Sequence, residues 1–578
     1  MKSIYSRAAQ KLSGMWTRKA APEEEKEIVK GRRRLSTRVR LMCRRFRLAA
    51  EDWFMLAALG AIMALCAVAI DWIVTQMHDL HLWCYSMVTD STDGIWKYVA
   101  TYTLWTGFTM VVATLAAVIT RYISPQAIGV VIKNFLSLRT LAAKIIGVTI
   151  GLASGLPLGK EGPFVHISGI MAHQLSRLVN GMKDGIYANE ARGVEMLAAG
   201  CAVGVACTFS APIGGVLFSI EVTSVFFAVR NYWRGFFASA AAAVVSRLIN
   251  PLIKERDLDL NAYFQTYFQP GKTFTYQELP LFALIGLGCG CYGAAFVFCH
   301  RKTMLFLRRN TIAKKIFQRY WYIYPILVTL FIGTITYPEG LGQFLAGRQK
   351  FTKTIGNLFT NCTWSANANQ SWACDHTVTD EWKGKSHDSS IFISLALFQV
   401  VYFFVCILSV TIPMPSGIFI SVFIIGASFG RMIGEIFSVI LDGRIETGGH
   451  LQVICPGVYA VVGAASFAGA VTHTVSIAVI LFEATGQLLF LLPLGVIIAN
   501  AVASFLQPSI YDSIIRLKNL PFLPDIKHTV AIFHEITVQR VMVTPVRFLP
   551  ARNCTYQLIQ AALTEKPPIS ALPVVESI

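Results

Sequence analysis

Charged residues are scarce in this 578-residue chain: Asp, Glu, Lys and Arg make up 15% of it, while 54% is hydrophobic. Soluble domains carry nearer a quarter of charged residues, so a soluble globular protein is disfavoured. The sequence also lacks a nucleophile–base–orienting set and cysteines at metal-ligand spacing, so we expect no enzyme and no metal site. The 13 cysteines lie mainly in apolar stretches, where they are expected to pack as small apolar side chains.

Long apolar runs are abundant instead. Several approach or exceed the roughly 20 residues that a helix needs to cross a bilayer. Clear examples begin at Trp53, Tyr102, Ile391 and Leu489. Four such runs predict a protein that crosses the membrane several times.

Acidic residues are rare where basic residues gather. Residues 1–50 hold 15 Lys and Arg against 4 Glu, and the segment His300–Tyr320 is basic with no acid at all. Basic segments beside membrane spans stay in the cytoplasm, so both are predicted to be cytoplasmic. We interpret the tail as lipid-facing rather than as a nucleic-acid patch. No apolar core precedes residue 52, so we expect no cleavable signal peptide.

The same charge pattern predicts that a polar loop, about 338–389, lies outside the cell. The loop carries glycosylation acceptors at Asn361 and Asn369, and two cysteines, Cys362 and Cys374, twelve positions apart. A disulfide between these cysteines is possible in an oxidising space, and the sequence alone leaves it open.

Many apolar segments are short and interrupted by glycine or proline. Such breaks at membrane depth are tolerated where they line a cavity or are buried in protein. LPLGKEGPFVH, from Leu156, and TIPMPSGIFISVF, from Thr411, each place Pro and Gly just before a fresh helical run. Corresponding breaks in two halves of a chain indicate inverted repeats with a binding site near the middle of the membrane.

Two helix N-termini aimed at one point favour an anion, because their unpaired N–H groups carry partial positive charge. Lys160 is expected to supply a field at the entrance, since a fixed cation against the ion would bind it too tightly to release it. Glu161 is a carboxylate where the anion belongs, able to occupy that site and to leave it when protonated or repelled. Ionisable side chains inside a membrane indicate function.

With these motifs the sequence resembles the CLC family of chloride channels and chloride/proton exchangers, from about Trp53 to Ile578. Gly159–Pro163 (GKEGP) matches the motif whose glutamate is the family's gate. Gly417–Phe419 matches the start of the GxFxP motif, whose backbone amides line the ion path, and Tyr511 matches the tyrosine that coordinates chloride. SIEVTSVFFAVRNYWRGFF, from Ser219, looks like the plasma-membrane channel branch.

The resemblance implies a voltage-gated chloride channel of the plasma membrane. It implies a homodimer of all-α subunits in the bilayer, each with two inverted repeats and its own chloride path, with no cofactor, no nucleic-acid partner and any accessory subunit unspecified. Glu161 is the candidate gate. The candidate chloride-binding residues are Lys160, Glu161, Gly162, Ile418, Phe419 and Tyr511.

One position distinguishes a channel from an exchanger. CLC exchangers typically follow the glutamate that matches Glu221 with a second glutamate, which passes protons toward the gate. Here Val222 occupies that place. An apolar side chain cannot relay a proton, so passive conduction is favoured and exchange is the lesser alternative.

Two positions depart from the family pattern. The motif GSGIPE of the first repeat is absent at Gly129–Val130, where about a dozen residues, some three turns of helix, are missing. A non-conducting or regulatory isoform subunit is therefore an alternative function. Ser421 stands where GxFxP ends in proline, and we expect its hydroxyl and N–H to be tolerated as a helix cap.

We divide the chain into four parts: a basic cytoplasmic tail (1–50), a first membrane repeat (51–250), a second membrane repeat with the extracellular loop (251–520), and a cytoplasmic linker with an incomplete first CBS motif of α/β type (521–578). CBS motifs work in pairs, so nucleotide binding is not expected of this chain. Both termini are expected to be cytoplasmic.

Overall fold

The computed structural model divides into two compact units, Met1–Leu520 and Pro521–Ile578, each described by itself. It describes the backbone from residue 33, except for the following positions: 129–134, 181–189, 225–227, 255–263, 265, 267, 269–273, 312–314, 316–319, 346–348, 366–372, 375, 384–389, 448–449, 487–490, 521–535, 542–547, 552–553, 565–571 and 576–578. Side chains are described for most of the remaining residues from residue 50 onward.

The larger unit is built from helices in two sets. The first half of the chain forms α3 (Arg33–Ser91), α4 (Gly94–Ile123), η1 (Pro125–Ile128), α5 (Leu138–Ala153), α6 (Glu161–Asn180), α7 (Glu190–Phe209), α8 (Pro212–Thr223), η3 (Val229–Asn231) and α9 (Tyr232–Lys254). Seven helices among the described residues are long and apolar enough to cross a membrane, as the apolar runs predict. The protein is therefore a multi-pass membrane protein.

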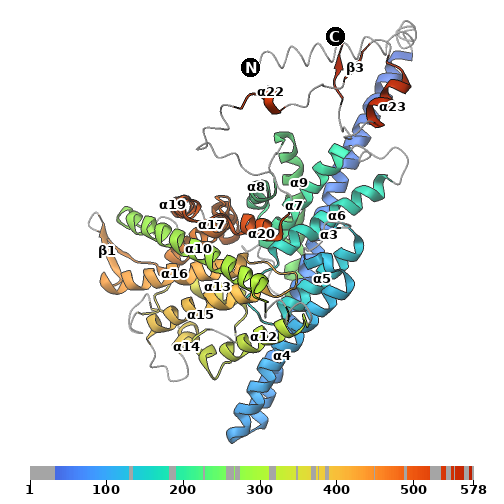
Figure 1. Ribbon diagram of the computed structural model, residues 1–578. Helices are drawn as coiled ribbons and strands as arrows, with labels where there is room; N and C mark the ends of the chain where they lie inside the picture. The colour runs from blue at the N-terminus through green and yellow to red at the C-terminus, as the bar shows by residue number, and fades with distance from the viewer. Residues whose placement is uncertain are drawn as a thin grey trace. The chain divides into compact units, whose positions relative to one another are not determined.

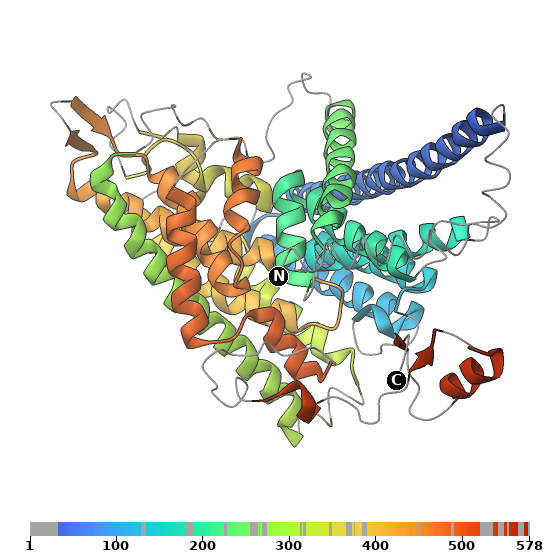
Figure 2. The same ribbon diagram turned by 90° about the horizontal axis from the view of Figure 1, so that it is seen from above.

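The second half of the chain adds more helices and one hairpin. Its elements are η4 (Tyr276–Glu278), α10 (Leu279–Arg309), α12 (Ile323–Thr336), η5 (Leu341–Phe344), α13 (Phe351–Leu358), α14 (His376–Lys383), α15 (Ile391–Thr411), α16 (Phe419–Ile440), β1 (Arg444–Thr447), β2 (His450–Val453), α17 (Pro456–Thr472), α18 (Ile477–Thr485), α19 (Leu491–Leu506) and α20 (Ile510–Lys518). Strands β1 and β2 pair antiparallel, Arg444 opposite Val453. Figures 1 and 2 show the two sets of helices side by side, one on each side of the larger unit.

Helix α16 is packed against α17 through glycines. A Cβ on Gly426 would overlap the carbonyl oxygen of Gly463, and a Cβ on Gly463 would overlap that of Gly426. Small residues allow such backbone contact between helices in a membrane, where packing rather than a hydrophobic driving force holds helices together. These contacts hold the middle of α16 against α17.

A buried ion pair also holds α16 against the segment that follows α13. Arg431 and Glu435 are fully buried and 3.0 Å apart, and the Arg431 guanidinium donates to the carbonyl groups of Leu358, Thr360 and Cys362. Glu435 accepts from the backbone amides that follow, at Trp364 and Ser365. Both charged groups, the Arg431 guanidinium and the Glu435 carboxylate, are thus paired and hydrogen-bonded, which offsets the cost of removing them from water. The structure joins Cys362 to Cys374 in a disulfide within the same segment.

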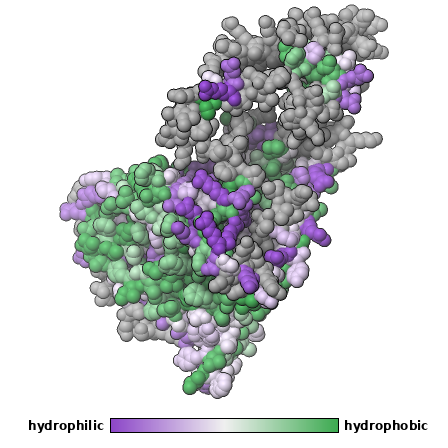
Figure 3. All heavy atoms as spheres, viewed as in Figure 1, coloured by the Kyte–Doolittle hydropathy of each residue, from purple (hydrophilic) through white to green (hydrophobic). Residues whose placement is uncertain are grey.

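On the face seen in Figure 3, hydrophobic residues cover much of the second half of the larger unit. Along α15 the side chains of Ile393, Val400 and Phe404 are 65%, 58% and 55% exposed and recur at helical spacing. Such a stripe on a helix that is long enough to span a bilayer is expected to face lipid.

The smaller unit is short. Its described elements are α22 (Val538–Val541), β3 (Leu549–Pro550), α23 (Tyr556–Thr564) and β4 (Val574–Val575). Strands β3 and β4 pair in parallel, with α23 as the crossover between them.

Candidate anion site

The two broken segments singled out in the sequence meet in the structure. The Gly159 amide donates to the Gly417 carbonyl at 2.8 Å, and the Gly417 amide donates to the Gly159 carbonyl at 2.7 Å. A Cβ on Gly159 would overlap the Glu161 carboxylate, and a Cβ on Gly417 would lie 2.7 Å from Glu161 Oε2. Only glycine at both positions allows the backbones to approach this closely with the carboxylate beside them.

Both segments lead directly into helices. Helix α6 begins at Glu161, and α16 begins at Phe419, with Ile418 as an N-cap that makes no side-chain hydrogen bond. The first backbone bonds of these turns run from Phe164 to Lys160 (2.8 Å) and from Val422 to Ile418 (3.1 Å). The amides before Phe164 and Val422 have no carbonyl within their own helix, so two positive helix ends lie beside the glycine bridge.

The Glu161 side chain lies at this point and is only 5% exposed. The backbone amides of Lys160, Glu161 and Ile420 surround its carboxylate, yet neither oxygen has a hydrogen bond of normal geometry in the described part of the chain. A buried carboxylate that lacks such bonds is held weakly, because nothing repays its lost hydration in full. Chemically, the arrangement suits an acid that exchanges places with another anion.

The Lys160 ammonium is directed to α3. It contacts both carboxylate oxygens of Asp71 at 2.6 Å and lies 6.0 Å from the centre of the Phe164 ring. Its charge is therefore largely compensated. The role of Asp71 was missed from the sequence, where the signal is an acid placed inside the apolar run that starts at Trp53.

Tyr511 lies in the first turn of α20, whose N-cap Ser509 accepts the Asp512 amide at 3.1 Å. The tyrosine is within electrostatic range of the Glu161 carboxylate and packs against the core of the second half. The Gly159–Gly417 bridge brings the candidate residues at the starts of α6 and α16 together, whereas the link from Tyr511 of α20 to this site is electrostatic.

Ser421 lies in the first turn of α16 and is fully buried. The prediction that it serves as a helix cap is wrong. Its hydroxyl donates to the Pro157 carbonyl, at 2.6 Å, because that carbonyl belongs to the non-helical segment packed directly against the turn.

The remaining sequence candidates lie elsewhere or are not described. Asn361 is exposed beside the disulfide, whereas Asn369 and the junction Gly129–Val130 lie outside the described residues. Val222 is partly buried and packs against the core of the second half.

Glu221 has a partner that the sequence did not reveal. Its carboxylate accepts the backbone amides of Val475 (2.9 Å) and Ser476 (3.0 Å) and the Ser476 hydroxyl (2.6 Å), at the start of α18. A carboxylate at a helix start is favoured by the helix dipole and by the unpaired amides.

The reverse contact also exists. Glu483 of α18 accepts the amides of Ile213 (3.1 Å) and Gly214 (2.7 Å) at the start of α8. Each helix therefore carries the carboxylate that caps the other. The signal in the sequence was weak, because α8 begins at Pro212 after an alanine that offers no side-chain cap.

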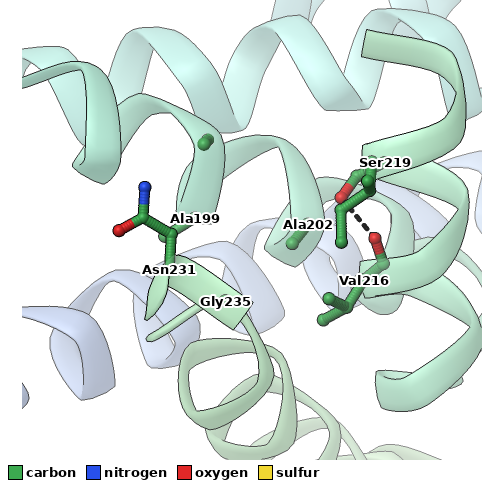
Figure 4. Close-up of a pocket in the computed structure, with 8 residues that line it drawn as sticks. Ala199, Ala202, Val216, Ser219, Asn231 and Gly235 are labelled. Atoms are coloured by element: carbon green, nitrogen blue, oxygen red, sulfur yellow. Dashed lines mark hydrogen bonds between the residues drawn. The ribbon is translucent and has the colours of Figure 1, made fainter. Parts of the chain in front are cut away.

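One pocket lies apart from this site, between α7, α8 and α9 (Figure 4). Its lining is mostly small or apolar, including Ala199, Ala202 and Gly235. The Ser219 hydroxyl, which borders it, already donates to the Val216 carbonyl at 2.8 Å. The amide of Asn231 is the other polar group of the lining, and no charged side chain is among the lining residues.

Comparison with known proteins defines the class. The family model described as voltage gated chloride channel matches residues 108–505, so the chain belongs to the CLC family. It is 26% identical to the chain in a crystal structure of a eukaryotic CLC transporter, with a TM-score of 0.65, covering 91% of this chain and 85% of that one. The fold is accordingly the all-α CLC fold of tilted and broken helices.

Two relatives are particularly similar. Chloride channel protein clh-3 of Caenorhabditis elegans is 50% identical over 558 residues, covering 92% of this chain and 55% of that protein. Chloride channel protein 2 of Homo sapiens is 43% identical over 527 residues, covering 89% of this chain and 58% of that protein. The chain thus spans somewhat over half the length of these relatives.

The reciprocal caps predict matched losses of stability. Glu221→Ala and Glu483→Ala each leave two backbone amides without their acceptor, so each is expected to destabilise the purified chain by about 1 kcal/mol, as for a lost helix cap. Thermal unfolding in detergent measures this. Glu446→Ala, at an exposed position in the β1–β2 hairpin, is the control and should leave the melting temperature unchanged. A loss from only one of the two variants would contradict reciprocal capping.

Proposed function

We propose that this chain forms a passive, voltage-gated chloride channel of the plasma membrane. The observation that carries the proposal is the pair of helix starts, α6 and α16, joined by the Gly159–Gly417 bridge beside a buried carboxylate. Two partial positive charges attract an anion but bind it less tightly than a full cation would. Rapid conduction requires that the ion can leave the site as readily as it enters. The pairing of Lys160 with Asp71 supports this, because it draws the nearest ammonium away from the carboxylate.

The proposed path replaces the hydration of chloride with protein donors. Backbone amides of Lys160, Glu161 and Gly162 come from the first half and those of Ile418 and Phe419 from the second, and the Tyr511 hydroxyl donates from α20. Glu161 closes the path when its carboxylate lies against the two glycines, where it takes the place of the ion. Protonation or repulsion by an entering anion moves the carboxylate away and opens the path.

Passive conduction is preferred to coupled exchange. Val222 cannot carry a proton, and both oxygens of the neighbouring Glu221 are occupied by the start of α18. The names of the similar relatives, which are chloride channel proteins, support the same choice.

The assembly that we propose is the one that the CLC family implies. We propose a homodimer with one path per subunit, cytoplasmic termini, and glycosylation at Asn361 and Asn369 on the outer side. Trp233, Val244 and Leu248 of α9 are 65%, 57% and 56% exposed along one face, which supports burial of that face in lipid or in a second copy. We also propose a CBS motif after Pro521, supported by the parallel pair β3–β4 with α23 between them.

A second candidate function is a non-conducting or regulatory subunit. The sequence observation that favours it is the loss of about a dozen residues of the family pattern at Gly129–Val130. Such a subunit would pair with full-length partners and change their current.

The reversal potential of whole-cell current tests these functions against one another. With the 578-residue chain at the cell surface, we expect the reversal potential to follow an imposed chloride gradient and to ignore a proton gradient. A shift with the proton gradient would indicate an exchanger. Surface protein without current would indicate the non-conducting subunit.

The role of Glu161 predicts a loss of gating. Glu161→Ala removes the competing carboxylate, so current should become independent of voltage. Gly159→Ala is expected to act in the same direction, because its methyl group displaces the carboxylate. Both are measured by voltage-step recording.

Gly193→Ala is the control for the glycine variant, since a Cβ there meets nothing within 4 Å. It should gate like the unaltered chain. Voltage gating that survives in Glu161→Ala would contradict the assignment of the gate.

A further inference from the structure

Ser421 links the two halves of the chain at the proposed anion path. It lies in the first turn of α16, is 0% exposed, and donates its hydroxyl to the Pro157 carbonyl at 2.6 Å. Pro157 belongs to the segment that carries Glu161. The bond is therefore a third connection between the segments already joined by the reciprocal bonds of Gly159 and Gly417.

Two separate attachment points restrict the motion of the first-half segment more than one attachment point does. The glycine bridge fixes the distance between Gly159 and Gly417 but leaves the first-half segment able to pivot about that point. The Ser421 bond holds the same segment again, two residues earlier. Between these points the chain is compact, because the Leu158 amide donates to the Leu156 carbonyl at 2.8 Å. The spacing and orientation of the two helix starts are therefore set together.

The chemistry of serine matters at this position. A proline here would have neither a side-chain donor nor an N–H. Serine keeps its backbone amide, which lies before the first intrahelical bond at Val422 and so has no carbonyl within α16. Ser421 thus supplies one bond to the segment that carries Glu161 and keeps one backbone donor in the first turn of α16.

We infer that Ser421 is a positioning residue that determines anion selectivity, by holding the starts of α6 and α16 at the spacing that suits chloride. The inference rests on the proposed anion path. A closely held ring of amides favours a small anion, and a relaxed ring lowers the penalty for a larger, weakly hydrated anion such as iodide. Loss of the Ser421 hydroxyl therefore shifts preference toward iodide.

The test compares four substitutions in the full chain. Ser421→Ala removes the hydroxyl, Ser421→Thr keeps it, and Ser421→Pro removes both hydroxyl and N–H. Ser428→Ala is the matched control, because Ser428 is also 0% exposed on α16 and its hydroxyl bonds Gln399 Oε1 (2.5 Å) and the Ile425 carbonyl (2.9 Å), away from the Glu161 segment. The readouts are the iodide-to-chloride permeability ratio under bi-ionic conditions and the melting temperature.

Ser421→Ala should raise the ratio about two- to tenfold, the equivalent of one ordinary hydrogen bond. Ser421→Pro should raise it at least as much, and Ser421→Thr should restore it. Ser428→Ala should lower the melting temperature about as much as Ser421→Ala does, because each variant loses a buried hydroxyl. It should leave the permeability ratio unchanged. The same ratio change in Ser428→Ala, or none in Ser421→Ala, would overturn the inference. If the threonine variant does not fold, the two alanine variants decide.

A chain that carries no current would refute conduction without refuting this inference. In that case chloride and iodide binding to the purified chain in nanodiscs, measured by calorimetry, replaces permeability. A change in the ratio of the two affinities in Ser421→Ala and not in Ser428→Ala supports the selectivity role, and an unchanged ratio overturns it.

Discussion

The pair of hydrogen bonds between Gly159 and Gly417 is the contact on which the rest of the arrangement depends. It joins two segments from different halves of the chain and brings the starts of α6 and α16 together. Neither glycine tolerates a side chain with the Glu161 carboxylate in place. Other contacts position α16, which follows Gly417. It packs against α17 through glycines and is bound to the segment after α13 through Arg431 and Glu435.

Most of the buried charges described above have a partner of opposite charge or a set of backbone donors. Lys160 is paired with Asp71, Arg431 with Glu435, and Arg234 with Glu195 at 2.7 Å. Glu221 and Glu483 are occupied by helix starts. The Glu161 oxygens, in contrast, have no hydrogen bond of normal geometry among the described residues. Paired charges are costly to separate, so we expect the carboxylate that lacks such bonds to be the one that moves, in agreement with the gating role proposed for Glu161.

Local sequence patterns predicted much of this architecture. Glycine and proline before fresh apolar runs indicated the helix starts, which the structure has at Glu161 and Phe419, and the apolar run from Trp53 lies within α3. Contacts between remote segments could not be predicted. The pairing of Lys160 with Asp71, the cap from Glu483 and the bond from Ser421 to Pro157 depend on tertiary packing, which brings distant residues together without a local pattern. Ser421 is an example. Its position in the first turn of a helix suggested a cap, but tertiary packing places its hydroxyl against the Pro157 carbonyl.

We propose that the two helix starts beside the Gly159–Gly417 bridge form an anion site. Anomalous diffraction from crystals of the chain in bromide tests it directly, because bromide substitutes for chloride and its position is measured without assumption. With the Glu161→Gln variant, which removes the competing negative charge, we expect an anomalous peak between the starts of α6 and α16. Bromide bound only elsewhere, with nothing at those helix starts, would contradict it.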